Sequence, residues 1–347
     1  MTRKSTLLWF VLLFSMCSCI SYEKISIEVF TPAKLSLPSG IKKVTLVSRN
    51  LKYTTDTLRN YRVINRRLVK DKIRIDVDSL AKKTCLDSLA GKLTDQNRFD
   101  SIIILPVSVW PEIRVKEIRP AVSSWYKNVS EKTGADALIL LDMFSCFYSI
   151  DDRFDNPQVN VVTSNIWSIY DALANKIIDR YTQIDTLYWN GFDDTNTFKK
   201  IKLPDKTDAI RLSAGVIGQN YAKRIISDWK LVYRDIMTSR NPELQKALKL
   251  AQAGNWDDAS VIWQRFSDEK NNRNQIIGFY NLALASEMEG NTDKALGFCA
   301  LAAKASAGML RSPANEAVRK YAAILYSRKL EIEKLSQQDG PRQAIYN

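Results

Sequence analysis

The side chains that most often perform chemistry in proteins are scarce in this sequence. It contains no histidine among 347 residues, which excludes Ser-His-Asp and Cys-His catalysis, histidine metal sites and a histidine switch near neutral pH. Beyond Cys19, the cysteines Cys85, Cys146 and Cys299 lie far apart inside apolar patterns. A disulfide framework or a zinc site needs clustered cysteines, so we interpret these three as buried free thiols.

Two acidic clusters have residue types that could bind a cation or cleave a glycan. Asp151–Asp155 lacks the central glycine and the distant glutamate of an EF-hand calcium loop, which favours a solvated turn. Asp193 and Asp194 are adjacent, and adjacent side chains of an extended chain point apart instead of converging on one bond. No phosphate loop, nucleophile elbow or metalloprotease helix is present. The sequence therefore predicts no catalytic residue, no metal site and no cofactor.

The first residues have the composition of a secretory leader. Arg3 and Lys4 precede a short apolar stretch, 7–14, and a Ser-Met-Cys-Ser-Cys exit. A bilayer span needs roughly twenty apolar residues, so this segment is too short to cross a membrane comfortably. The exit resembles the lipobox of bacterial lipoproteins, in which a small residue precedes the cysteine that is acylated. Ser18 precedes Cys19 and favours it over Cys17, which bulky Met16 precedes. An ordinary cleaved leader is the alternative.

The chain is basic, with a formal net charge of +13 and a globular composition of 45% hydrophobic and 26% charged residues. Seven basic residues and one acidic residue lie between Arg59 and Arg74. In an exported protein such a stretch meets anionic lipid headgroups or acidic envelope polymers, not nucleic acid. The alternative, a solvated basic face that binds nothing, is favoured.

Hydrophobic periodicity predicts a mixed α/β region followed by helices. Residues 19–39 are predicted to be a lipidated tether with one short strand at 25–30. The expected strands are 41–48, 101–105, 137–144, 159–170 and 176–188, and the expected helices are 76–93, 122–132 and 208–237. The last helix rests on apolar residues that recur every three or four positions.

Two stretches resemble the α/β domain shared by the N-terminal part of TolB and the CsgG and LpoB envelope lipoproteins. Lys132-Thr-Gly134-Ala-Asp136-Ala resembles that family's helix-Gly-Ala-Asp-strand junction, and 167–171 with 176–178 resembles its strand–turn–strand hairpin. The resemblance implies an α/β domain over residues 40–238. It implies no activity, because such folds carry unrelated functions.

The C-terminal third repeats itself. Gly254-Asn-Trp-Asp-Asp-Ala259 recurs after 36 residues as Gly290-Asn-Thr-Asp-Lys-Ala295, which resembles the tetratricopeptide repeat with its helix pairs. This implies an all-α, tetratricopeptide-like region over residues 239–336, closed by a helix from Pro313 to about 335. Ala259 and Ala295 are predicted to be the small residues where paired helices press closest. Residues 337–347 are predicted to be a disordered tail.

The combination of leader (1–18), lipidated Cys19, α/β domain and helical repeats resembles an uncharacterised lipoprotein family of Bacteroidota. It implies a palmitate-bearing lipoprotein of the outer membrane, since Ile20 after the cysteine gives no aspartate retention signal.

We expect a non-catalytic scaffold or adaptor that recruits a protein partner. By analogy with tetratricopeptide repeats the inner surface of the second repeat would bind it, through Ile277, Tyr280, Leu284, Glu287 and Met288. The alternative for these residues is packing on the α/β domain. Alternative functions are a subunit of a CsgG-like secretion or assembly machine and, more remotely, an enzyme acting on glycan or peptide.

Overall fold

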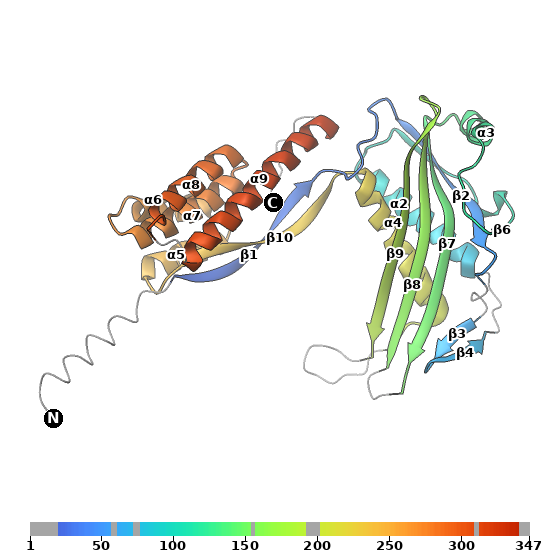
Figure 1. The fold of residues 1–347 in the computed structure, drawn as a ribbon, viewed down its shortest axis with the longest axis horizontal. Helices are drawn as coiled ribbons and strands as arrows, with labels where there is room; N and C mark the ends of the chain where they lie inside the picture. Colours follow the sequence, from blue (N-terminus) through green and yellow to red (C-terminus); the bar gives the residue numbers. More distant parts are fainter. Residues whose placement is uncertain are drawn as a thin grey trace, which may run out of the picture. The chain divides into compact units, whose positions relative to one another are not determined.

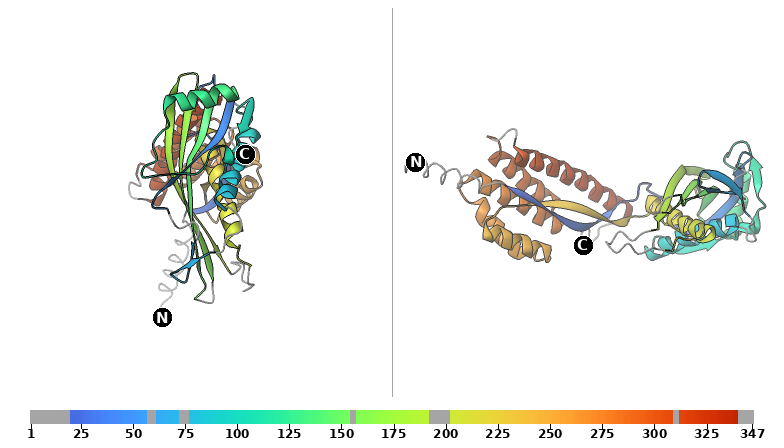
Figure 2. Two further views of the ribbon diagram at one scale, coloured as in Figure 1. Left: turned by 90° about the vertical axis from the view of Figure 1, so that its right-hand side faces the viewer. Right: turned by 90° about the horizontal axis from the view of Figure 1, so that it is seen from below.

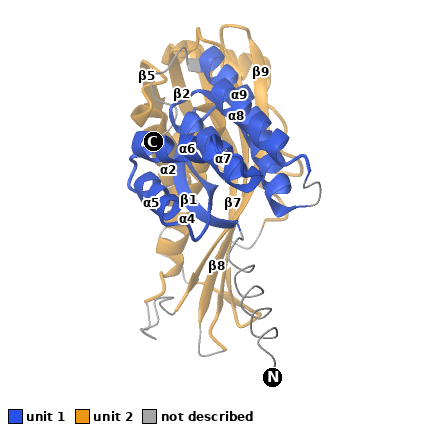
Figure 3. Cartoon of the chain, turned by 90° about the vertical axis from the view of Figure 1, so that its left-hand side faces the viewer, with its two compact units in different colours: residues 1–32, 227–347 blue, residues 33–226 orange. Residues whose placement is uncertain are grey.

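The computed structural model describes residues 20–56, 61–71, 77–153, 157–191, 202–308 and 312–339. The chain forms two compact units (Figures 1 and 3), one of residues 33–226 and one made by the N-terminal segment to Pro32 together with residues from Ser227 onward. We call them the α/β unit and the ribbon–helix unit. The predicted leader (1–18) and Cys19 lie outside the described residues.

The α/β unit is built on an eight-stranded sheet. Its strands are β2 (Lys43–Tyr53), β3 (Tyr61–Ile64), β4 (Arg67–Lys70), β5 (Ser101–Ile104), β6 (Ile113–Val115), β7 (Ala137–Asp151), β8 (Gln158–Asp171) and β9 (Lys176–Asn190). The long strand β7 pairs in parallel with β2 along its first half and with β3 near its end, and antiparallel with β8 along its length. Strand β9 continues the meander beside β8, while β5 and β6 pair with β2.

Helices cover the sheet from both sides. The helices α2 (Val77–Asp95) and α4 (Lys206–Ile225) pack against each other on one face (Figure 2). The first half of β7 is apolar at consecutive positions because its alternate side chains enter different cores. Ile139 and Leu141 join the core under α2 and α4, and Leu138 and Leu140 join a second core with Tyr126 of α3 (Ser123–Thr133). The mixed α/β class is confirmed.

The Gly-Ala-Asp junction has a structural role in the fold. Gly134 adopts a left-handed conformation, φ 62°, and ends α3, as expected for a residue without a Cβ. The Asp136 carboxylate then accepts hydrogen bonds from the backbone N–H groups of Lys42 and Lys43, at 2.9 and 2.8 Å. The motif thereby aligns the starts of β7 and β2.

The predicted helix over 208–237 is wrong in its second half. The helix α4 ends at Ile225, and residues Asp228–Thr238 form the strand β10. Residues Trp229, Val232 and Ile236 fit a helical stripe, but the same segment also carries the β-branched and aromatic residues that favour strands. Strand β10 pairs antiparallel with β1 (Ser21–Thr31) over eleven positions. Pairing across the chain overrides the local periodicity here.

The same pairing corrects the predicted tether. Of residues 19–39, Ser21–Thr31 form a strand of the ribbon–helix unit, in place of the short strand expected at 25–30. The predicted boundary of the α/β domain at 238 also differs, because the chain has returned to the ribbon–helix unit by Ser227.

Helices α5 (Pro242–Gln252), α6 (Trp256–Ser267), α7 (Asn272–Met288), α8 (Thr292–Ala305) and α9 (Pro313–Asp339) complete the ribbon–helix unit. Each helix packs against the next along the chain. Gly254 and Gly290, with φ of 82° and 78°, form the turns between α5 and α6 and between α7 and α8. Residues 337–339, predicted to belong to a disordered tail, are the last turn of α9.

Candidate functional site

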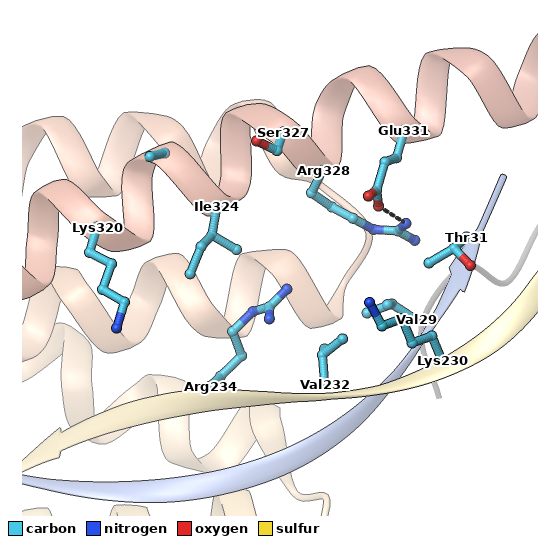
Figure 4. A pocket seen from close by; sticks show the side chains of 11 residues that line it. Val29, Thr31, Lys230, Val232, Arg234, Lys320, Ile324, Ser327, Arg328 and Glu331 are labelled. Carbon is cyan, nitrogen blue, oxygen red and sulfur yellow. Dashed lines mark hydrogen bonds and ion pairs between the residues drawn. The ribbon is translucent and has the colours of Figure 1, made fainter. Parts of the chain in front are cut away.

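A groove in the ribbon–helix unit runs between one face of the β1–β10 ribbon and α9 (Figure 4). It has a volume of about 410 Å³. Its walls are Val29, Thr31, Lys230, Val232 and Arg234 from the ribbon and Lys320, Ala323, Ile324, Ser327, Arg328 and Glu331 from the helix.

The two walls follow from the geometry of their elements. In the pairing of β1 with β10, Val29 lies opposite Lys230. Val232 and Arg234 follow on β10 at every second position, and alternate residues of a strand lie on the same face. On α9 the wall residues recur every three or four positions, which places them on one side of a helix. Neither wall makes a groove alone.

A buried polar network fixes the floor of the groove. The Arg234 guanidinium donates two hydrogen bonds to the Glu287 carboxylate of α7, at 2.9 and 2.7 Å, and the two side chains are 8% and 0% exposed. The Tyr321 hydroxyl donates to the same carboxylate at 2.7 Å. Burial is the main cause that raises the pKa of Tyr321, and the nearby Glu287 carboxylate adds to it. Tyr321 is therefore a neutral donor, and Arg234 is held in one orientation.

The groove carries more positive than negative charge. On α9, Arg328 pairs with Glu331 at 2.9 Å, and the Arg328 side chain is 2% exposed. Lys230 and Lys320 are exposed, and neither forms an ion pair with any residue in the described part of the chain. An anionic group entering the groove would meet these two amines.

A second pocket, of about 390 Å³, adjoins the groove and shares Arg234, Lys320 and Ile324 with it. It adds aromatic walls from both ribbon strands and α7, namely Tyr22, Tyr233 and Tyr280. Together the two hollows follow α9 from Pro313 to Glu331, about 27 Å at 1.5 Å per helical residue. An extended chain of about eight residues has that length.

The five residues predicted to bind a partner occupy a different place from the one expected. Ile277, Tyr280, Leu284 and Glu287 are buried and Met288 is half-buried. They belong to α7, which contacts α6, α8, α9 and β10. The packing alternative placed them on the α/β domain, whereas the elements that bury them belong to the ribbon–helix unit. Tyr280 also lines the second pocket, and Glu287 acts on the groove through Arg234.

The groove residues themselves were missed by sequence reasoning. They come from segments about 200 and 90 residues apart, 29–31, 230–234 and 320–331. The sequence contains two signals for the groove. Lys320 and Arg328 are basic residues eight positions apart in the last predicted helix. Lys230, Val232 and Arg234 follow one another at every second position. That alternation is the period of a strand and was assigned to a helix.

The cysteines have the environment of inert thiols. Cys85 and Cys299 are buried and Cys146 is partly buried, all three without a disulfide. Burial raises the pKa of Cys146 and of Cys299 to about 12 and raises that of Cys85 further. Protonated thiols are poor nucleophiles and poor metal ligands.

A second polar cluster lies in the α/β unit. The Lys52 ammonium, 2% exposed, is 2.5 Å from the Asp78 carboxylate at the start of α2. Asp56 lies 3.8 Å from the same ammonium and accepts a hydrogen bond from Ser145. Because the Lys52 ammonium lies close to both carboxylates, the cluster has a structural role in joining β2, β7 and α2.

The basic stretch Arg59–Arg74 forms the β3–β4 hairpin where it is described. Arg62 lies 3.7 Å from Asp71, and Arg66 and Arg67 are exposed at the turn. Arg59, Lys72 and Arg74 lie outside the described residues, as do Asp193 and Asp194. Binding of an anionic polymer or lipid here stays a prediction.

Within the ranges that the structure describes, no three acidic or cysteine side chains gather as metal ligands would. In the same ranges no helix is both long enough and apolar enough to cross a bilayer.

Comparison with known proteins identifies families without an assigned role. The model of DUF8603, a domain of unknown function, matches residues 41–236, more than half of the chain. The model of DUF6340, also a domain of unknown function, matches residues 245–331. No curated protein matches. The predicted origin in Bacteroidota stays a prediction.

Three solved structures are similar at low identity. The PelC dodecamer from Paraburkholderia phytofirmans is 10% identical, over 59% of this chain and 99% of that one, with a TM-score of 0.25. A minor lipoprotein from Acinetobacter baumannii is 12% identical, over 54% and 89%, with a TM-score of 0.24. The hypothetical protein CT253 from Chlamydia trachomatis is 10% identical, over 53% and 93%, with a TM-score of 0.25. Such TM-scores carry no functional argument.

Proposed function

Because the chain belongs to the DUF8603 family, which is defined by a domain of unknown function, we propose a role for it from its own residues. The protein is a non-catalytic lipoprotein of the cell envelope, anchored in the outer membrane through a lipid on Cys19. It recruits a protein partner through the groove of the ribbon–helix unit.

The observation that carries this proposal is the open groove itself. Its apolar centre, Val232 and Ile324, offers contact area, and its polar walls offer orientation. Because its pairing with Glu287 already holds Arg234 in place, this side chain loses little freedom when a partner binds. Raised thiol pKa values and the mutually paired Lys52 cluster favour binding over catalysis.

The position of Cys19 supports the anchoring half of the proposal. Strand β1 begins at Ser21, two residues after Cys19, which is about 7 Å of chain at most. A lipid on Cys19 would therefore hold the ribbon–helix unit close to the bilayer surface. Lipid anchors of several acyl chains hold stably.

The helical hairpins of this unit support a tetratricopeptide-like description. Both Gly-Asn turns reverse the chain between packed helices, and Ala259 and Ala295, the predicted close-packing positions, are fully buried. We propose that these hairpins are the support on which α9 and the ribbon form the groove.

Affinity purification of the lipidated protein from its native envelope tests recruitment. Ser327 lines the groove, whereas its neighbour Tyr326, 60% exposed, does not. We expect Ser327→Trp, which fills the groove, to lose the co-purified partner, and Tyr326→Trp to keep it. Loss in both variants, or retention in both, would remove the groove from the proposal.

Metabolic labelling with a clickable fatty acid tests the anchor. Wild-type protein and Cys17→Ser should be labelled, and Cys19→Ser should not. Label that persists in Cys19→Ser and disappears in Cys17→Ser would move the lipid to the other cysteine.

A further inference from the structure

The cations of the groove stand in two groups, one at each end of an apolar centre (Figure 4). Lys320 of α9 and Arg234 of the ribbon lie at one end, and Arg328 and Lys230 lie at the other. Ile324 lies across the groove from Arg234, and Val232 lies between Arg234 and Lys230.

The separation of the two ends can be worked out from either wall. On α9, Lys320 and Arg328 are eight residues apart, which is about 12 Å of helix. On β10, Lys230 and Arg234 are four residues apart, which is about 13 Å of strand. On both walls, therefore, the backbone positions of the two basic residues are about the same distance apart along the groove.

That spacing matches one simple ligand. In an extended peptide, side chains at positions i, i+2 and i+4 point to the same side, and i and i+4 are about 13 Å apart. Carboxylates at i and i+4 would reach the two cationic ends while an apolar side chain at i+2 covers the centre.

The existing ion pairs leave room for such carboxylates. The two arginines are already paired, Arg234 with Glu287 and Arg328 with Glu331. An incoming carboxylate would therefore engage a lysine, which is Lys320 at one end and Lys230 at the other. Ammonium–carboxylate hydrogen bonds in a partly desolvated groove are stronger than neutral ones.

We propose that the groove binds an extended peptide segment of a protein partner, with acidic residues four positions apart and an apolar residue midway. The inference rests on the proposed recruitment of a protein partner and specifies its chemistry. A lipid surface fits less well, because these cations line a recess between the ribbon and α9 and do not project from a convex face.

Fluorescence anisotropy with defined peptides and the purified mature chain tests the inference. The probe is the labelled octapeptide SETVTETS, whose glutamates are four apart around a valine. The first comparison peptide, SQTVTQTS, lacks the charges. The second, SETVETTS, keeps them but sets the glutamates three apart, so that one points away from the groove.

We expect SETVTETS to bind, and to bind about tenfold or more tightly than either comparison peptide. Lys320→Glu and Lys230→Glu should each weaken its binding by about tenfold or more. Lys246→Glu, on the exposed side of α5, makes the same change in net charge and should leave binding within about twofold. A peptide with one glutamate replaced by lysine should regain affinity for Lys320→Glu.

Equal binding of SETVTETS and SQTVTQTS, no binding of SETVTETS, or equal weakening by all three lysine variants would each overturn the inference. Binding to phosphatidylglycerol vesicles that depends on Lys230 and Lys320, with no peptide binding, would overturn it in favour of a lipid. A partner lost only in Ser327→Trp, without acidic-peptide binding, would leave the recruitment proposal standing and reject this ligand.

Discussion

The buried Arg234–Glu287 pair is predicted to stabilise the ribbon–helix unit, and the variant Glu287→Gln tests it. The carboxylate is fully buried and takes three hydrogen bonds, two from Arg234 and one from Tyr321. Glutamine keeps one acceptor oxygen but loses the charge, so a guanidinium is left buried without its counter-ion. Breaking such a pair costs about 3–5 kcal/mol of unfolding free energy, and we expect the lower end for Gln.

The matched control is Glu289→Gln, two residues further along. Glu289 pairs with Lys294 at 3.0 Å, but the two side chains are 42% and 49% exposed. An exposed pair contributes at most about 1 kcal/mol. Urea unfolding, with amide hydrogen exchange in α7 to assign the transition to this unit, measures both losses. Replacing both partners, Arg234→Met with Glu287→Leu, should recover most of the stability. Equal small losses for Glu287→Gln and Glu289→Gln would refute the reasoning.

Three further stability predictions follow from the helix contacts. A Cβ on Gly278 would lie 2.7 Å from the backbone oxygen of Trp263, whereas nothing lies within 4 Å of one on Gly297. Gly278→Ala should therefore lower the free energy of unfolding by about 1–3 kcal/mol, and Gly297→Ala should raise it by up to about 1 kcal/mol. Urea unfolding measures both changes. A change of the same sign in both variants would contradict the packing described for Gly278. Ala295→Leu should cost about 1–3 kcal/mol, and an unchanged melting curve would reject close packing there. Tyr280→Ala should lower the melting temperature by removing a buried ring worth about 3–5 kcal/mol; an unchanged melting temperature would mean that the ring is exposed.

Local patterns were sufficient for most elements of the α/β unit. The helix at 122–132 was predicted from its periodicity and from Gly134, and it spans Ser123–Thr133. The strand at 137–144 was predicted from a largely apolar run, and β7 starts at Ala137. Such signals are readable because they depend on neighbours in the sequence.

The ribbon was not predictable in the same way. The residues of β10 satisfy a helical and a strand period at once, and only pairing with β1, some 200 residues away, decides between them. The same long-range pairing determines the groove, because its walls exist only when β1, β10 and α9 come together. The predicted partner-binding residues of α7 do not form an exposed surface. They were expected to face solvent, but β10 and α9 pack against α7.

Site-specific photo-crosslinking tests the central claim most directly. A benzophenone amino acid replaces Ser327, inside the groove, or Tyr326, on the neighbouring face of α9. After irradiation of intact cells, we predict one discrete crosslinked protein from position 327 and none of that mass from position 326. The adduct should disappear when Lys320→Glu is combined with the probe. The same adduct from both positions, or none from position 327, would contradict recruitment through this groove.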